Sequence, residues 1–267
     1  MGYGDYDDGL DDDEEEEDLG PAVAVLDASS PTGEACVLQL LLLRRRVVAV
    51  VDDVDAARAS FGASVKCVDS DASPKALAAA LKGCASAIVP GKLGSAAEVV
   101  ALARDGGGTP RVVCLSALDK LSEDDAANAK LVSSLLGVVG VGDGGEAARL
   151  AAPSRETTLA EALPSAGSDP TVFVRVPLPI RDAMGGDTVF IGAENEYNAT
   201  AGDAPLSRVD VANVLAALAA APVPSAVASS STNGAVVVEA GARGARANGG
   251  SLIDWAINAS QKANVPQ

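Results

Sequence analysis

Residues 23–43 read VAVLDASSPTGEACVLQLLLL, and this stretch decides the fold. Its start, Val23 to Leu26, is a short apolar run of strand-forming residues, and the part from Asp27 to Gly33 is dense in turn-forming residues. Apolar residues then recur at helical spacing between Val37 and Leu41. The sequence therefore predicts a strand, a tight turn and a helix, which together form the first unit of a parallel α/β sheet.

The turn resembles the opening of the atypical short-chain dehydrogenase/reductase families, in which it reads Gly-x-x-Gly-x-x-Gly. Asp27 stands in the place of the first glycine, Ser30 in the place of the second, and Gly33 keeps the third. The first two glycines serve the tight turn and the approach of the phosphates, whereas the third lets helix and strand pack closely. Asp27 also brings a negative charge to the place of an anionic ligand, and Pro31 lacks a backbone N–H. Two interpretations stay open: a turn kept for packing alone, and nucleotide binding in an altered form.

The resemblance also implies which residues would hold a nucleotide. In the turn these residues are Ser29, Ser30, Thr32 and Gly33. A strand predicted over 47–51 ends at Asp52, nineteen residues beyond Gly33, which is the spacing at which an acid binds the adenosine ribose hydroxyls. An acid there favours NAD(H) over NADP(H), if either binds. Asp71 stands where the family has an aspartate near the adenine, although it could equally cap a turn.

Strands and helices are predicted to alternate along most of the chain. Further strands are predicted over 64–68, 85–89, 111–115, 171–175, 188–191 and 236–239, and helices over 55–61, 75–81, 96–104, 156–163, from 207 onward and over 251–263. Ser73 before Pro74 marks one helix start, and the Ser-x-x-Asp motif of Ser207 and Asp210 marks another that we expect to be structural. This order predicts an α/β fold, namely a Rossmann-like doubly wound parallel sheet with a small C-terminal subdomain.

The chain divides into three regions by composition. Residues 1–20 form an acidic N-terminal arm that we expect to be disordered alone. Residues 21–240 form a Rossmann domain that resembles the NAD(P)-binding domain of the atypical short-chain dehydrogenases/reductases. Its substrate-side subdomain is expected at roughly 176–240. Residues 241–267 form a C-terminal extension with a helix, where Trp255, the single tryptophan, suits an anchor against the core or a partner.

Charge and residue usage exclude several classes of function. The net charge is −17, and setting aside the eleven acids of residues 1–20, which hold no base, leaves −6. Direct binding of nucleic acid is therefore not expected, since it needs clustered Lys and Arg. The sequence has no histidine, which excludes Ser-His-Asp and Cys-His catalysis and histidine metal sites. The four cysteines lack metal-ligand spacing and are predicted to be buried thiols in a reducing compartment.

Catalysis of the short-chain dehydrogenase type needs a Tyr-x-x-x-Lys pair, in which the lysine lowers the pKa of the tyrosine. The tyrosines are Tyr3, Tyr6 and Tyr197, and none has a lysine four residues on. The family has a serine at the place of Ser116 that helps to polarise a substrate carbonyl. If the chain is an enzyme, we expect Ser116 and Lys130 to supply its proton chemistry.

These observations lead to two hypotheses of different class. The first is a non-catalytic Rossmann-fold protein that serves as a structural, accessory or assembly subunit of a larger complex, by resemblance to accessory factors of photosynthetic and respiratory complexes. That resemblance suggests a plastid location, with membrane association through partner subunits only, because no stretch reaches the roughly 18 apolar residues of a span. The second is an NAD(P)H-dependent reductase or isomerase. A nucleotide-sensing regulatory subunit lies between the two.

Overall fold

The computed structural model describes eleven segments of the chain. They are residues 20–92, 96–105, 111–118, 150, 154–162, 171–178, 180–186, 189–193, 206–221, 229–230 and 235–242. Residues 1–19 of the predicted acidic arm, Lys130 and the predicted terminal helix with Trp255 lie outside these residues.

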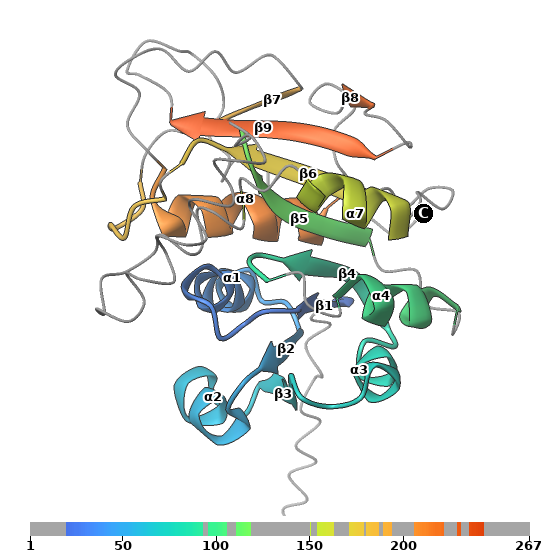
Figure 1. Ribbon diagram of the computed structural model, residues 1–267. Coiled ribbons are helices and arrows are strands. Elements are labelled where there is room, and N and C mark those ends of the chain that lie inside the picture. Colours follow the sequence, from blue (N-terminus) through green and yellow to red (C-terminus); the bar gives the residue numbers. More distant parts are fainter. Residues whose placement is uncertain are drawn as a thin grey trace, which may run out of the picture.

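One mostly parallel sheet organises the described residues (Figure 1). The strand order is β3-β2-β1-β4-β5-β6-β9-β7, with the two-residue β8 beside β9. This is the doubly wound order, in which the chain reverses direction across the sheet between β1 and β4. The strands are β1 (Ala22–Val25), β2 (Val47–Val51), β3 (Val65–Asp69), β4 (Cys84–Val89), β5 (Arg111–Ala117), β6 (Thr171–Val176), β7 (Val189–Ala193), β8 (Ser229–Ser230) and β9 (Val236–Ala242).

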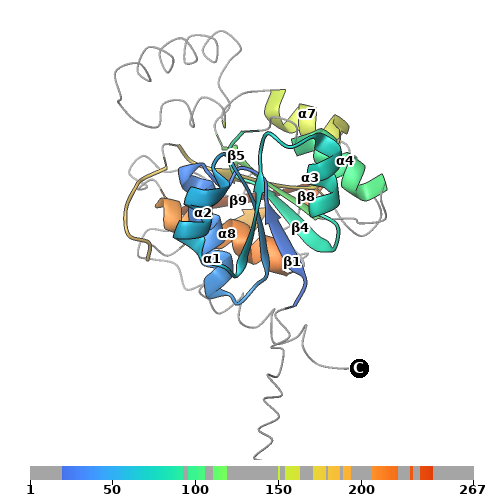
Figure 2. The ribbon, with the colours of Figure 1, turned by 90° about the horizontal axis from the view of Figure 1, so that it is seen from below.

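Helices cover both faces of the sheet (Figure 2). The helices are α1 (Pro31–Leu42), α2 (Val54–Phe61), α3 (Pro74–Ala80), α4 (Ala96–Asp105), α7 (Ser154–Ala162) and α8 (Arg208–Ala220). The buried side chains of α1, α2 and α8 belong to one hydrophobic cluster, and those of α3, α4 and α7 belong to a second. Successive strand residues alternate between the two clusters: Val113 and Leu115 face α8, whereas Val112 and Cys114 face the opposite side. The Rossmann-like doubly wound fold is therefore confirmed.

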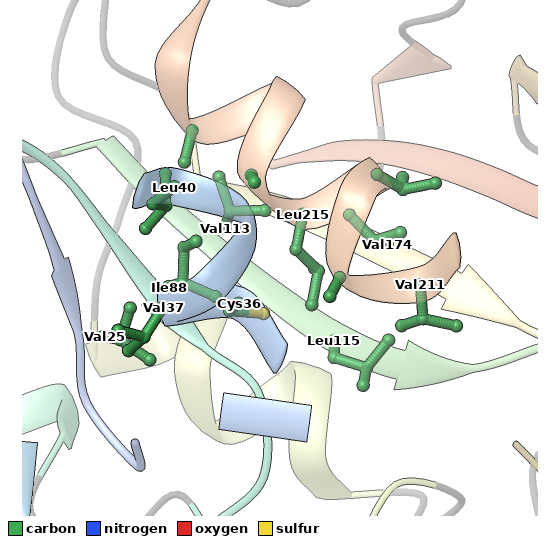
Figure 3. Close-up of a cluster of buried hydrophobic side chains, with 14 of the residues drawn as sticks. Val25, Cys36, Val37, Leu40, Ile88, Val113, Leu115, Val174, Val211 and Leu215 are labelled. Atoms are coloured by element: carbon green, nitrogen blue, oxygen red, sulfur yellow. The ribbon is translucent and has the colours of Figure 1, made fainter. Parts of the chain in front are cut away.

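The core between α1 and α8 is built from aliphatic side chains and is closely packed (Figure 3). Val37 and Leu40 of α1 and Leu215 of α8 are fully buried there, together with Ile88 of β4. Five successive alanine, leucine and valine positions of α8, Val214 to Leu218, are at most 3% exposed, so the helix is buried nearly all round. This packing fixes α1, and with it the turn that precedes α1.

The sequence predicted most elements within one or two residues of their bounds. Ser73 caps α3 by accepting the Ala76 N–H, and Pro74 is its first residue, as predicted. Ser207 caps α8 by accepting the Asp210 N–H. The C-terminal strands extend the same sheet: β9 pairs parallel to β6, and β7 pairs antiparallel to β9.

The cysteines of the described residues, Cys36, Cys67, Cys84 and Cys114, are free thiols and all are buried, as predicted. Burial raises the pKa of the Cys84 thiol, and the nearby charges of Lys66 and Arg46 lower it by less. In the unfolded chain the pKa of the Cys84 thiol returns to its ordinary value. At alkaline pH the folded protein therefore keeps the thiol proton, whereas the unfolded chain releases it, and this difference affects stability. This contribution to stability is complete below about pH 8.5 and is lost as the pH rises through the raised value.

We therefore expect the free energy of unfolding to fall as the pH rises above about 8.5, and to fall less steeply in Cys84→Ala. Urea unfolding at a series of pH values measures both slopes. Val89→Ala, in the same strand, also loses buried volume but no titrating group, so it should lower stability equally at each pH. A Cys84→Ala slope equal to the wild-type slope would contradict this prediction.

Candidate functional site

A pocket of about 250 Å³ opens at the carboxyl ends of β1, β2 and β3. It lies beside the point where the strand order reverses, which is where open α/β sheets bind ligands. Its apolar residues can hold a flat base, and its polar residues stand at the strand ends. The lining residues are Leu26, Asp27, Val50, Asp52, Ser70, Asp71, Leu77, Lys92, Ala96 and Val99.

The turn between β1 and α1 is held by its own side chains. Ser30 Oγ donates to the carbonyl of Asp27 at 2.7 Å and accepts the Gly33 N–H at 3.1 Å, so Ser30 caps α1. A Cβ at Gly33 would lie 1.9 Å from the Asp27 carbonyl oxygen and 2.8 Å from Ala28 Cα. The third glycine of the motif is thus required for the close approach of helix and turn.

Asp27 connects this turn to the turn that follows β4. Its side chain is only 9% exposed, and its Oδ2 accepts the backbone N–H of Lys92 at 2.7 Å. A Cβ at Gly91 would lie 2.3 Å from Asp27 Oδ2 and 3.5 Å from Ser30 Oγ, so the two turns touch. The carboxylate that replaces the first glycine therefore joins the two loops on either side of the reversal point.

Asp52 stands at the end of β2, as the spacing predicted, and is exposed in the pocket. Its Oδ1 accepts from Ser70 Oγ at 2.8 Å, and its backbone N–H donates to Ser29 Oγ at 2.8 Å. Within the described part of the chain, Oδ2 of Asp52 makes no hydrogen bond. The carboxylate is thus positioned by Ser70 and keeps an oxygen that can accept from a ribose hydroxyl.

Asp71 also lines the pocket, and its side chain is exposed. Its backbone N–H donates to Asp69 Oδ1 at 2.8 Å, so Asp69, rather than Asp71, closes the turn there. Of the predicted nucleotide-binding residues, Asp52 and Asp71 therefore share the pocket. Ser29 accepts the backbone N–H of Asp52, whereas Thr32 is fully buried at the start of α1.

Two buried charged residues near the site were not predicted from the sequence. Arg208, at the start of α8, is 6% exposed and donates to Thr32 Oγ1 and to Asp182 Oδ1, each at 2.5 Å. Arg155 of α7 is 3% exposed and donates to the carbonyls of Leu115, at 2.9 Å, and Val89, at 3.5 Å. Arg208 joins α8 to the first turn of α1, and Arg155 holds the ends of β4 and β5 together.

The Ser-x-x-Asp motif is structural, as predicted. Asp210 is 3% exposed, accepts from Ser207 Oγ at 2.6 Å and accepts the Gly186 N–H at 3.0 Å. A Cβ at Gly185 would lie 3.0 Å from Asp210 Oδ1. The aspartate thus closes the first turn of α8 and holds the segment 181–186, which follows β6, against it.

Of the two candidate proton-transfer residues, the structure describes Ser116 but not Lys130. Ser116 lies within β5, is fully buried and pairs in register with Arg175 of β6. Arg175 in turn forms a two-pronged ion pair with Glu156 of α7, at 3.0 and 2.7 Å. Lys130 lies outside the described residues, so a role for Ser116 and Lys130 stays a prediction.

Other kinds of site are not found where the structure is described. No group of three or more acidic, cysteine or histidine side chains in the described segments could hold a metal ion. Among the helices described, none is both long enough and apolar enough to cross a bilayer.

No known sequence family and no curated protein matches the chain. Its fold, however, matches solved structures. A proposed epimerase from Bacteroides thetaiotaomicron aligns with a TM-score of 0.58 and 14% identity, over 85% of this chain and 99% of that one. An anaerobillin reductase from Escherichia coli O157:H7 aligns with a TM-score of 0.54 and 19% identity, over 85% and 100%. A Rossmann-fold NAD(P)-binding family protein from Shigella flexneri aligns with a TM-score of 0.51 and 13% identity, over 86% and 97%. At these identities the matches show a shared Rossmann fold.

Proposed function

We propose that this chain binds a ligand that contains adenosine, in the pocket between the ends of β1, β2 and β3. The observation that carries the proposal is the place of Asp52. Its carboxylate stands at the end of β2, is fixed by Ser70 and faces a pocket whose other side is apolar. A carboxylate in this place accepts hydrogen bonds from the ribose hydroxyls, while Leu77 and Val99 offer an apolar surface to the base.

Among dinucleotides, the pocket favours NAD(H) over NADP(H). A 2′-phosphate would be brought against the carboxylates of Asp52 and Asp71, and like charges at close range repel. Among the described residues of the lining, the only cationic one is Lys92, which follows β4 rather than β2. The proposal therefore includes a selection against the 2′-phosphate.

Calorimetric titration of the purified chain with NADH and NADPH tests this proposal. We expect NADH to bind at least about tenfold more tightly than NADPH, a difference of about 1.4 kcal/mol. Asp52→Ala should weaken NADH binding by about tenfold or more, because the hydrogen bonds to the ribose hydroxyls are lost. Asp55→Ala is the matched control, since it removes the same charge from the exposed first turn of α2 and lies outside the pocket. Equal binding of NADH by all three proteins would place the ligand elsewhere.

For the role of this binding, we propose an accessory subunit that responds to its adenosine ligand, rather than an enzyme with its own turnover. The support is chemical: the chain has no Tyr-x-x-x-Lys pair and no histidine, and Ser116 is fully buried. A plastid location would follow only from the resemblance to accessory factors of photosynthetic complexes. Co-purification with partner subunits in a fixed ratio, altered by the ligand, is the expected result.

An NAD(P)H-dependent reductase or isomerase is the second candidate, and the fold favours it. The solved structures of the same fold include a reductase and a proposed epimerase. Oxidation of NADH by the purified chain in the presence of a carbonyl substrate, lost in Asp52→Ala, would support this candidate against the accessory role.

A further inference from the structure

We infer that the pocket selects adenosine ligands by the charge of their 5′ substituent. It accepts a neutral or cationic group there and discriminates against a 5′-phosphate. This inference rests on the proposed function, because it takes adenosine to lie in the pocket with its ribose at Asp52. The 5′ carbon then points from β2 toward β1 and the start of α1, where a Rossmann fold holds the phosphates.

The first observation is the position of the Asp27 carboxylate. It is nine-tenths buried at the pocket wall, on the β1 side where the 5′ substituent would lie. Its Oδ2 already accepts the backbone N–H of Lys92, so a donor that faces this side of the pocket is in use. The negatively charged carboxylate thus occupies a place where a phosphate oxygen would otherwise accept a hydrogen bond from that N–H.

The second observation is the shortage of backbone donors at the start of α1. Pro31, the first helical residue, has no N–H, and the N–H of Gly33 donates to Ser30 Oγ. Anion binding at a helix start depends on such N–H groups being available to the ligand. The N–H of Glu34 donates to the Ser30 carbonyl, so the N–H groups of Gly33 and Glu34 are both used within the chain.

The third observation is that the turn has little room to open. The Asp27 carbonyl accepts from both Ser30 N and Ser30 Oγ, and Gly33 touches that carbonyl closely. On the opposite side, Gly91 packs against the Asp27 carboxylate and close to Ser30. The path that a diphosphate would take between the two turns is therefore crossed by the contact between Asp27 and the loop after β4.

The charges of the lining point the same way. Among the described residues that line the pocket, three are acidic, namely Asp27, Asp52 and Asp71, and one is basic, namely Lys92. The lining is therefore net negative, which disfavours a phosphate and favours a neutral or positively charged substituent. A sulfonium or amine group attached at the 5′ position has the complementary charge.

Calorimetry with adenosine, 5′-AMP and NADH distinguishes the outcomes. For the wild-type chain we expect adenosine to bind at least about tenfold more tightly than 5′-AMP, with NADH no tighter than adenosine. Asp27→Asn keeps an oxygen that can accept the Lys92 N–H but removes the charge, so it should tighten 5′-AMP binding by about tenfold and change adenosine binding by less than about twofold. Asp105→Asn, an equal charge change on an exposed residue at the end of α4, should leave both affinities unchanged.

Each result decides between the claims. If 5′-AMP binds the wild-type chain as tightly as adenosine does, the charge selection is wrong and adenosine binding in the pocket stands. If Asp27→Asn and Asp105→Asn tighten 5′-AMP binding equally, the effect belongs to net charge and the role of Asp27 is refuted. If none of the three ligands binds any variant, the proposed function itself fails. Circular dichroism of each variant checks that the proteins compared are folded. Asp27→Gly is a second substitution that removes the same charge, for use if Asp27→Asn does not fold.

Discussion

Replacing Gly33 by alanine should cost about 3 kcal/mol or more of folding free energy, a large part of the stability of a typical domain. The added methyl group would stand 1.9 Å from the Asp27 carbonyl oxygen and 2.8 Å from Ala28 Cα, and both neighbours are backbone atoms that cannot turn aside. Either α1 must move away from the turn, or the turn must open. Urea unfolding of wild type and Gly33→Ala measures the difference.

Gly62→Ala provides the matched comparison for this prediction. Gly62 has φ +81°, and a Cβ there would meet no atom within 4 Å. The expected cost is the backbone strain alone, about 1–3 kcal/mol, because φ +81° with ψ 179° is a conformation that glycine almost alone adopts. If the two variants lose equal stability, the steric explanation for Gly33 is wrong.

Asp210→Ala is the second substitution with a large expected effect, about 3 kcal/mol. It leaves the Gly186 N–H and the Ser207 hydroxyl without their buried acceptor, and it frees the segment that follows β6. Urea unfolding gives the loss of stability. Limited trypsin digestion gives a separate readout, since cleavage after Arg181 should become faster once this segment is released.

Asp210→Asn tests the same contact with a side chain of equal shape. The amide oxygen can still accept the Gly186 N–H, so we expect a loss of only about 1 kcal/mol and little change in cleavage after Arg181. A result in which the asparagine variant is as unstable as the alanine variant would show that the charge, rather than the acceptor, holds the segment.

The sequence predicted the fold because its local signals agree with one another. The run 47–51 is apolar throughout, as a strand covered on both faces must be, and it is β2 with those bounds. Ser73 and Ser207 carry capping oxygens at the starts of α3 and α8, and both accept as predicted. β8 was missed because two serine residues carry no alternation of apolar and polar positions.

The site was predicted in part, and the missing part depends on contacts between distant segments. The place of Asp52 follows from its spacing after Gly33, which a sequence records directly. The hydrogen bond of Asp27 to Lys92 joins turns 65 residues apart, and no local pattern reports that approach. Arg155 and Arg208 were missed because arginine is usually exposed, and their burial depends on carbonyls and hydroxyls supplied by other elements.

The order of the elements along the chain has a consequence for how the protein folds. The described residues that line the pocket all lie between Leu26 and Val99, in consecutive strands and helices whose contacts are short in sequence. The other half of the sheet depends on remote partners, such as Val113 with Val172 and Val172 with Val236. Short-range contacts form faster than long-range ones, and the N-terminal part leaves the ribosome first. The strands of the first half of the sheet can therefore pair early, whereas the turn before α1 gains its full support only when α8 is available to cover α1.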